Sequence, residues 1–232
     1  ANGANYMAME FAGDGMKNLT ISDRVAICNL CVEAGAKTAL MEVDDITLEY
    51  LKEHGREPKY SFKSDDDAKF AKVYDIDLST IKPIVAKPHF VDSVVDATEC
   101  LGVHIDEAFL GSCNNGRIED LRVGANILKG KKVNPLVRFL VVPASQAVYE
   151  QALQEGLLKI FMDAGAIVMN PNCSVCWGSC QGVIGEGEVL ISTGTRNFKG
   201  RAGSPDSFVY LASAATVTAS AIAGEITTAD RV

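Results

Sequence analysis

The segment that decides the fold is IDEAFLGSCNNGR, residues 105–117, because a predicted strand runs directly into a cysteine there. Residues 105–110 are expected to form the strand, and Cys113 follows its carboxyl end. Open α/β sheets bind their ligands just beyond the carboxyl ends of the strands. Cys113 therefore lies where such a sheet would place a ligand.

Two further motifs follow predicted strands in the same way. Cys173 and Cys176 belong to NPNCSVCWG, which comes after a predicted strand at 166–169. The loop STGTRNFKGR, residues 192–201, comes after a predicted strand at 188–192. Since the carboxyl ends of parallel strands share one edge of a sheet, all three motifs are expected at that edge.

The rest of the second half alternates strand and helix. This order favours an α/β fold, a three-layer α/β/α arrangement with mostly parallel sheets and helices on both faces. Two more strands are predicted at 82–86 and 137–142, and helices are predicted at 91–101, 117–128, 145–163 and 205–223.

Residues 1–75 are expected to form a first α/β domain, and residues 76–232 a second domain that carries the cysteines and the arginine loop. In the first, Thr20 to Asp23 can cap a helix that ends at Gly35. Strands are predicted at 6–11 and 38–43, a helix at 46–54, and another helix after the acidic run at 64–67.

Composition excludes several classes of partner. Of the 232 residues, 47% are apolar, and the net charge of −8 comes without any basic cluster. Nucleic acid and anionic membrane surfaces are therefore not expected as partners. No apolar run is long enough to span a bilayer, and residues 208–223 are expected as a buried helix. An acidic substrate would need local arginines to hold it.

The chain has seven cysteines and shows no secretory signal, which favours a reducing compartment, and a cytoplasmic protein is expected. Cys28 and Cys31 form a second Cys-x-x-Cys pair. Together with Cys173 and Cys176 they could make a four-thiolate zinc site. The alternative is that they are small buried hydrophobes, because they lie within an apolar helical pattern.

Three thiolates can hold three corners of an iron–sulfur cube and leave the fourth iron open as a Lewis acid. A Cys-x-x-Cys pair alone could also be half of a zinc site, a redox pair or a chance spacing. Arg196 and Arg201, five residues apart, can bind a planar carboxylate through paired hydrogen bonds. The alternative for these arginines is a pair of solvated surface charges.

Taken together, these motifs resemble those of the aconitase superfamily. That family has a Gly-Ser-Cys-Thr-Asn motif, a later Asn-Pro-x-Cys-x-x-Cys-x-Gly motif, and then an Asn-Arg-Asn-Phe-x-Gly-Arg loop. The resemblance implies that Cys113, Cys173 and Cys176 bind a [4Fe-4S] cluster. It also implies that Arg196 and Arg201 bind substrate carboxylates.

The resemblance extends to residues 24–36, RVAICNLCVEAGA. It implies that Asn29 supports the cluster and that Glu33 is a catalytic residue near the open iron. Asn114 stands where the family has Thr, and Thr195 where it has Asn. Both are expected to act through hydrogen bonds around the cluster rather than as ligands.

Within the superfamily, the chain looks most similar to the cluster-carrying large subunit of a two-subunit hydro-lyase. The implied reaction removes water from a small di- or tricarboxylate and adds it back at the neighbouring carbon. A separate small subunit is expected to supply a serine base and the pocket for the substrate side chain. This chain therefore leaves open whether a branched dicarboxylate or a longer tricarboxylate is the substrate. A structural zinc protein or an iron sensor is the non-enzymatic alternative.

The sequence starts at Ala1 and lacks the family's Asp-Ser-His and His-Gly-Ala motifs. We therefore expect it to represent the C-terminal part of such a subunit and to be inactive alone. An exposed apolar patch is expected near Trp177, where the missing partners would bind.

Overall fold

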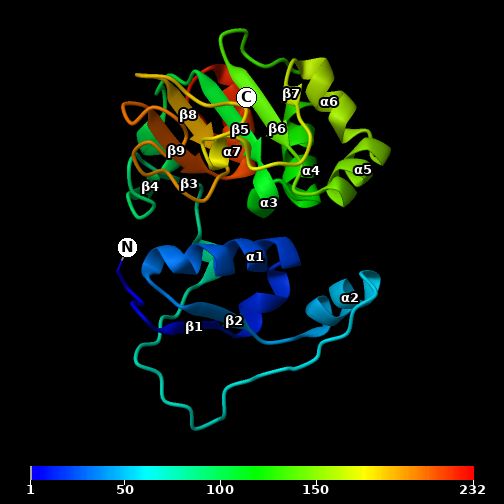
Figure 1. Ribbon diagram of the computed structural model, residues 1–232, viewed down its shortest axis with the longest axis vertical. Coiled ribbons are helices and arrows are strands. Elements are labelled where there is room, and N and C mark those ends of the chain that lie inside the picture. The colour runs from blue at the N-terminus through cyan, green and yellow to red at the C-terminus, as the bar shows by residue number, and fades with distance from the viewer. Residues whose placement is uncertain (1) are drawn as a thin grey trace. The chain divides into compact units, whose positions relative to one another are not determined.

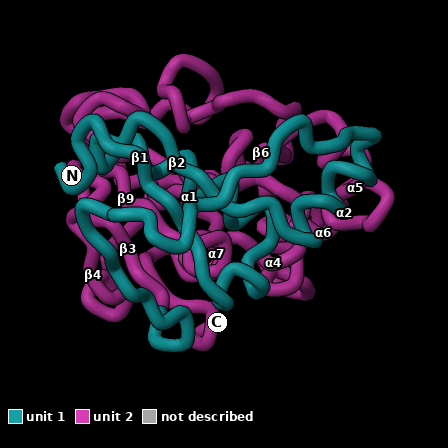
Figure 2. Tube along the Cα trace, turned by 90° about the horizontal axis from the view of Figure 1, so that it is seen from below, with its two compact units in different colours: residues 1–81 teal, residues 82–232 magenta. Residues whose placement is uncertain are grey.

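The computed structural model describes residues 2–232. The chain forms two compact units, residues 1–81 and 82–232 (Figure 2). We expected this boundary after residue 75. Among the described residues, no helix is long and apolar enough to cross a membrane.

A seven-stranded sheet forms the centre of the second unit (Figure 1). Its order is β4-β3-β9-β8-β5-β6-β7, and the five strands from β9 to β7 are parallel. β3 is antiparallel to both of its neighbours. The prediction of an α/β fold with a mostly parallel sheet is confirmed. The strands are β3 (Ile84–Ala86), β4 (Val94–Asp96), β5 (Glu107–Gly111), β6 (Arg138–Val142), β7 (Ile167–Val168), β8 (Val189–Ser192) and β9 (Phe208–Ala212).

Helices cover one face of this sheet. They bury apolar side chains such as Leu121, Phe161 and Val217 against inward residues of β5 and β6. The order of strand and helix along the chain produces this layer, because a crossover helix is the usual link between parallel strands. The helices of the unit are α3 (Ser112–Asn115), α4 (Ile118–Leu128), α5 (Gln146–Gln154), α6 (Leu157–Ala164) and α7 (Ala214–Ala223).

The opposite face is covered by loops. Phe109, Leu140 and Leu190 on the strands pack with Val175 and Ile184 of the segment that follows β7. In the described part of this unit, the third layer thus consists of loops and 3-10 turns rather than the helices that we expected. The loop that carries Cys173 and Cys176 belongs to this layer.

Three predicted helices of the second unit differ from the structure. Residues 91–101 form β4 and a 3-10 turn, η4 (Ala97–Cys100), and residues 208–212 form β9 before the last helix begins. Ser213 starts that helix by accepting a hydrogen bond from the Thr216 amide. The predicted helix at 145–163 is split because Gly156 adopts a left-handed conformation, φ 75°.

The first unit contains two parallel strands, β1 (Ala8–Phe11) and β2 (Thr38–Met41). Thr20 and Asp23 form a capping box at the start of α1, where the sequence predicts a helix N-cap. The Arg24 guanidinium is buried and donates two hydrogen bonds, 2.6 and 2.7 Å long, to the Asp44 carboxylate. The helical elements are η1 (Asp14–Asn18), α1 (Ile21–Leu30), η2 (Cys31–Ala34), α2 (Asp45–Glu53) and η3 (Leu78–Thr80).

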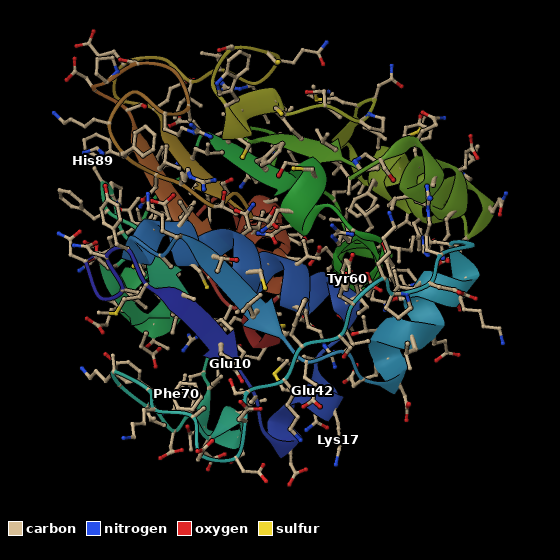
Figure 3. All side chains as sticks on the ribbon, turned by 60° about the horizontal axis from the view of Figure 1, so that its bottom comes forward. Glu10, Lys17, Glu42, Tyr60, Phe70 and His89 are labelled. Carbon is tan, nitrogen blue, oxygen red and sulfur yellow. The ribbon has the colours of Figure 1, made fainter. Side chains whose placement is uncertain are left out.

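The predicted helix after the acidic run at 64–67 is wrong. Residues 54–77, all of them described, contain neither helix nor strand. Ser64 instead donates a 2.5 Å hydrogen bond to Glu10. Figure 3 labels Glu10, along with Tyr60 and Phe70 from this segment, whose rings are exposed. A charged stretch that buries little apolar surface lacks the packing that stabilises most helices.

Candidate functional site

A tight turn between β5 and α4 positions Cys113. Side chains at Gly111 and Gly116 would meet the Val142 backbone oxygen of β6 at 2.7 and 2.3 Å, so only glycine fits at either position. Between them, Ser112 has a left-handed backbone, φ 73°. Such a conformation is costly for a residue with a Cβ and concentrates at functional sites. It leaves the Cys113 side chain exposed.

The Cys173 and Cys176 segment has a similar local geometry. It follows β7 and turns through a 3-10 helix, η5 (Ser174–Cys176). Ser174 is buried and has φ 45°. Its amide donates to the Asn172 side chain at 2.5 Å, and its hydroxyl donates to the Gln181 carbonyl at 2.7 Å. In the second unit, the two non-glycine residues with positive φ are therefore both neighbours of predicted ligands.

The structure brings the three predicted cluster ligands into one electrostatic neighbourhood. Burial raises the pKa of the Cys173 thiol, and negative charge on Cys113, Cys176 and Cys180 raises that pKa further. The positive charge of Arg201 acts in the opposite direction. All of these cysteines are free thiols.

This donor set fits an iron–sulfur cluster chemically, because three free thiols lie near one another at the carboxyl edge of the sheet. Within residues 2–232, no group of three or more His, Cys, Asp or Glu side chains is already arranged to hold a metal ion. The proximity is present, but the sulfurs do not converge on one point. The predicted roles of the cysteines therefore stay predictions.

The arginine loop is attached to the cysteine segment. Arg201 donates from Nε to the Cys176 carbonyl at 2.7 Å, and its guanidinium lies 5.3 Å from the centre of the Phe198 ring. Arg196 donates to the Thr195 hydroxyl at 2.9 Å. Thr195 is buried, so this predicted hydrogen-bonding residue fixes the side chain of a predicted substrate-binding residue. Their roles toward substrate stay predictions.

Three polar residues that we did not predict connect the loops of this edge. Asn115 donates to the Thr193 carbonyl, and the Gly111 amide donates to the Thr193 hydroxyl at 2.9 Å. Asn114, the predicted residue beside Cys113, is buried and donates to Asn115 at 3.1 Å. These bonds connect the loop after β5 with the loop after β8.

Asn197, the third of these residues, is fully buried and anchors the arginine loop. Its side chain donates to the Lys87 carbonyl at 2.9 Å and lies 3.3 Å from the Val209 carbonyl. The sequence feature that could have identified Asn197 is an amide side chain between two arginines in a loop. A buried amide can form hydrogen bonds with several backbone groups at once.

The other two predicted site residues belong to the first unit. Asn29 is exposed near the end of α1, and Glu33 is half-buried in η2. Their approach to the cysteines stays a prediction. Cys31 lies in a small core with Ala4 and Ala36, and its thiol donates to the Ile27 carbonyl at 3.2 Å. This packing favours the small hydrophobe over the zinc ligand.

Comparison with known families agrees with this fold and with these motifs. Residues 1–102 and 96–224 match the aconitase family (aconitate hydratase). The chain belongs to the aconitase family.

Three similar proteins carry the same enzyme name. The chain is 51% identical over 98% of its length to the probable 3-isopropylmalate dehydratase large subunit of Methanothermobacter thermautotrophicus, covering 54% of that protein. It is 48% identical over 97% of its length to the 3-isopropylmalate dehydratase large subunit of Caldicellulosiruptor saccharolyticus and covers 53% of it. The corresponding protein of Aquifex aeolicus is 48% identical over the whole chain, which covers 55% of it. The chain thus spans about half the length of the curated relatives that it matches.

Proposed function

We propose that this chain belongs to the large subunit of a [4Fe-4S] hydro-lyase, 3-isopropylmalate dehydratase, which acts in leucine biosynthesis. The observation that supports the proposal is the proximity of three free thiols and an arginine loop at one sheet edge. The names of relatives about half identical to the chain support the same assignment. The proposed reaction converts 2-isopropylmalate into 3-isopropylmalate by loss and re-addition of water.

In this proposal Cys113, Cys173 and Cys176 hold the cluster. When bound, a cluster with one open iron supplies a Lewis acid for a hydroxyl group and a neighbouring carboxylate. Arg196 and Arg201 orient the substrate by binding its carboxylates, since a guanidinium forms two parallel hydrogen bonds with a carboxylate. Glu33 is proposed to orient a bound water molecule. A serine from a small subunit is proposed to abstract the proton.

Reconstitution tests the ligand set. The chain is incubated anaerobically with ferrous iron and sulfide, and the bound iron and sulfide are measured. We expect a brown protein with about four irons per chain. Replacing Cys113, Cys173 or Cys176 by Ser should abolish retention of the cluster. Cys180→Ser is the matched control, because Cys180 is an exposed thiol in the same neighbourhood and should not be needed. A colourless chain that binds zinc instead would support the non-enzymatic alternative.

A coupled hydration assay tests the reaction. The reconstituted full-length large subunit is combined with its small subunit and offered isopropylmalate and, separately, homoaconitate. Turnover of isopropylmalate supports the proposal, whereas turnover of homoaconitate alone would indicate the alternative, a homoaconitase large subunit. We expect the present chain alone to be inactive. Activity of the chain alone would place the proton-transfer groups among residues 1–232.

A further inference from the structure

A buried carboxylate lies beneath the segment that carries Cys173 and Cys176. Glu107 is the first residue of β5, and its side chain is fully buried. One carboxylate oxygen, Oε2, accepts a 2.9 Å hydrogen bond from Arg138 Nε. The other oxygen, Oε1, is buried and has no hydrogen-bond partner. An unsatisfied buried carboxylate oxygen is costly, and it calls for an explanation.

The backbone at Gly182 lies against this oxygen. A Cβ added to Gly182 would be 3.2 Å from Glu107 Oε1, 3.6 Å from Ser174 Oγ and 2.1 Å from the Leu140 side chain. Gly182 also has φ 82°, a conformation that favours glycine. The chain at 182 therefore passes through a narrow space between β5, β6 and the cysteine segment.

Ser174 connects this contact to the cysteines. It lies directly after Cys173, and its hydroxyl donates to the Gln181 carbonyl at 2.7 Å. This hydrogen bond thus joins Ser174, near the start of the segment, to Gln181, next to Gly182 and Glu107. A shift of Gly182 would be passed to Ser174 and from there to Cys173.

A cavity gives this segment room to move. It has a volume of about 650 Å³ and is bounded on one side by Glu107 and Arg138 and on the other by residues 181–183. Apolar side chains complete its wall: Leu140, Ile167, Val168 and Met169. Because Oε1 is buried, a shift of the segment at 182 would give water in this space easier access to the carboxylate.

We propose that Glu107 is a positioning residue, which sets the conformation of the cysteine segment 173–182 from beneath through Gly182 and Ser174. The proposal rests on the proposed function in one respect: the segment matters to the enzyme because Cys173 and Cys176 are predicted cluster ligands. Its test needs neither iron nor substrate.

The charge state of Glu107 should control how tightly the segment 173–182 is held. Burial raises the pKa of Glu107 to about 7, against the lowering effect of Arg138, and the charge of Glu188 raises it as well. The other titratable groups nearby are Asp106, the adjacent residue, and His104, whose Nε2 lies 3.3 Å from Asp106. Above pH 7 the unpartnered oxygen would carry charge and attract water, which should loosen the segment. Below pH 7 the carboxyl is neutral, and the segment should stay closed.

Trp177 provides the readout. It is the only tryptophan of the chain and lies within the segment. Its fluorescence and its quenching by acrylamide are measured on the iron-free chain from about pH 5.5 to about pH 8.5, a range that brackets the Glu107 pKa. We expect a sigmoidal change with a midpoint near pH 7 and more quenching at the alkaline end. Burial raises the pKa of Cys173 above its ordinary value, which moves the titration of this thiol away from the range.

Three variants decide the assignment. Glu107→Gln keeps the shape of the side chain without its titration and should abolish the transition. His104→Gln should leave the midpoint unchanged. Glu188→Gln should lower the midpoint, since the charge of Glu188 raises the Glu107 pKa. If Glu107→Gln does not fold, the midpoint of the fluorescence transition in Glu188→Gln tests the assignment to Glu107 instead.

A wild-type chain without a transition would overturn the proposal. So would a transition that persists in Glu107→Gln, that disappears in His104→Gln, or that keeps its midpoint in Glu188→Gln. Because iron is absent, failure of the cluster proposal would leave this result standing, and failure of this proposal would leave cluster binding untouched.

Discussion

The two compact units differ in what stabilises them. The second unit buries large side chains on both faces of a seven-stranded sheet. The first has two strands and a core of three small buried residues, Ala4, Cys31 and Ala36. Its most buried polar contact is the ion pair of Arg24 and Asp44. A two-stranded sheet is marginally stable by itself. The second unit should therefore resist denaturant through apolar packing, whereas the first should open earlier and depend on charge.

The largest expected effect is a loss of stability that is confined to the second unit. Phe161 is fully buried and meets Phe139 edge-on, with ring centres 6.2 Å apart. Phe161→Ala should cost about 3–5 kcal/mol through lost burial and a cavity. Urea unfolding followed by Trp177 fluorescence measures it. Leu153→Ala is the control, because Leu153 is 61% exposed, and it should change stability by less than about 0.5 kcal/mol. An equal loss of amide-exchange protection in residues 1–81 would show that the units are not independent.

The pH dependence of stability should have opposite signs in the two units. The pKa of Glu107 is raised from 4.5 to about 7, so its contribution in the second unit is fully present below about pH 4.5 and is lost as the pH rises through 7. The loss should approach about 3 kcal/mol. Glu107→Gln should remove this slope.

In the first unit, the bonds from Arg24 hold the pKa of Asp44 well below its ordinary 3.8. Its contribution is therefore present above about pH 4 and lost on acidification. Amide exchange resolved by peptide measures both slopes. Slopes of the same sign in the two units would contradict the assignment of these two carboxylates.

A smaller loss of stability should be confined to the first unit. Asp44→Asn removes the charge that Arg24 pairs with, and Arg24 is only 5% exposed. We expect a cost of about 1.5–3 kcal/mol, the range for hydrogen bonds to charged groups. Asp45→Asn, at the next and exposed position, is the matched control and should have little effect. The readout is amide exchange in residues 1–81, and protection in residues 82–232 should not change.

The smallest expected effect tests whether Arg201, in the second unit, binds a substrate carboxylate. Arg201→Lys should lower kcat/KM of the assembled, reconstituted enzyme by at least about tenfold, equivalent to roughly 1.4 kcal/mol, because an ammonium lacks the paired donors of a guanidinium. Arg231→Lys, at an exposed arginine of the same unit, should not change it. Unaltered kinetics in Arg201→Lys would remove this residue from the proposed carboxylate site.

Sequence reasoning found the edge of the sheet but not all of the sheet itself. The three motifs were predictable because each follows an apolar strand that parallel pairing must bury. β9 was missed because its apolar run, 208–212, continues into the apolar helix α7. Ser213, the residue that separates them, was read as part of a helix. β4 was missed because three residues are too few to show a period.

The anchors of the site were harder to predict for a different reason. Glu107 is one charged residue at the start of a strand, and its burial depends on Gly182, which lies far along the chain. The Asn197 side-chain amide likewise donates to the distant carbonyl of Lys87. Such contacts are set by tertiary structure and leave no local pattern in the sequence.

The strand order also has a consequence for the synthesis of the chain. Strand β5 pairs with β8, and the Val189 amide donates to the Asp106 carboxylate, 83 residues earlier. A ribosome that adds about 5–20 residues per second needs roughly 4–16 s to make the stretch between them. During that time Cys113 has been synthesised, but the edge to which it belongs has not closed. If the chain takes up iron, loading should therefore follow translation of residues 82–232 rather than accompany it.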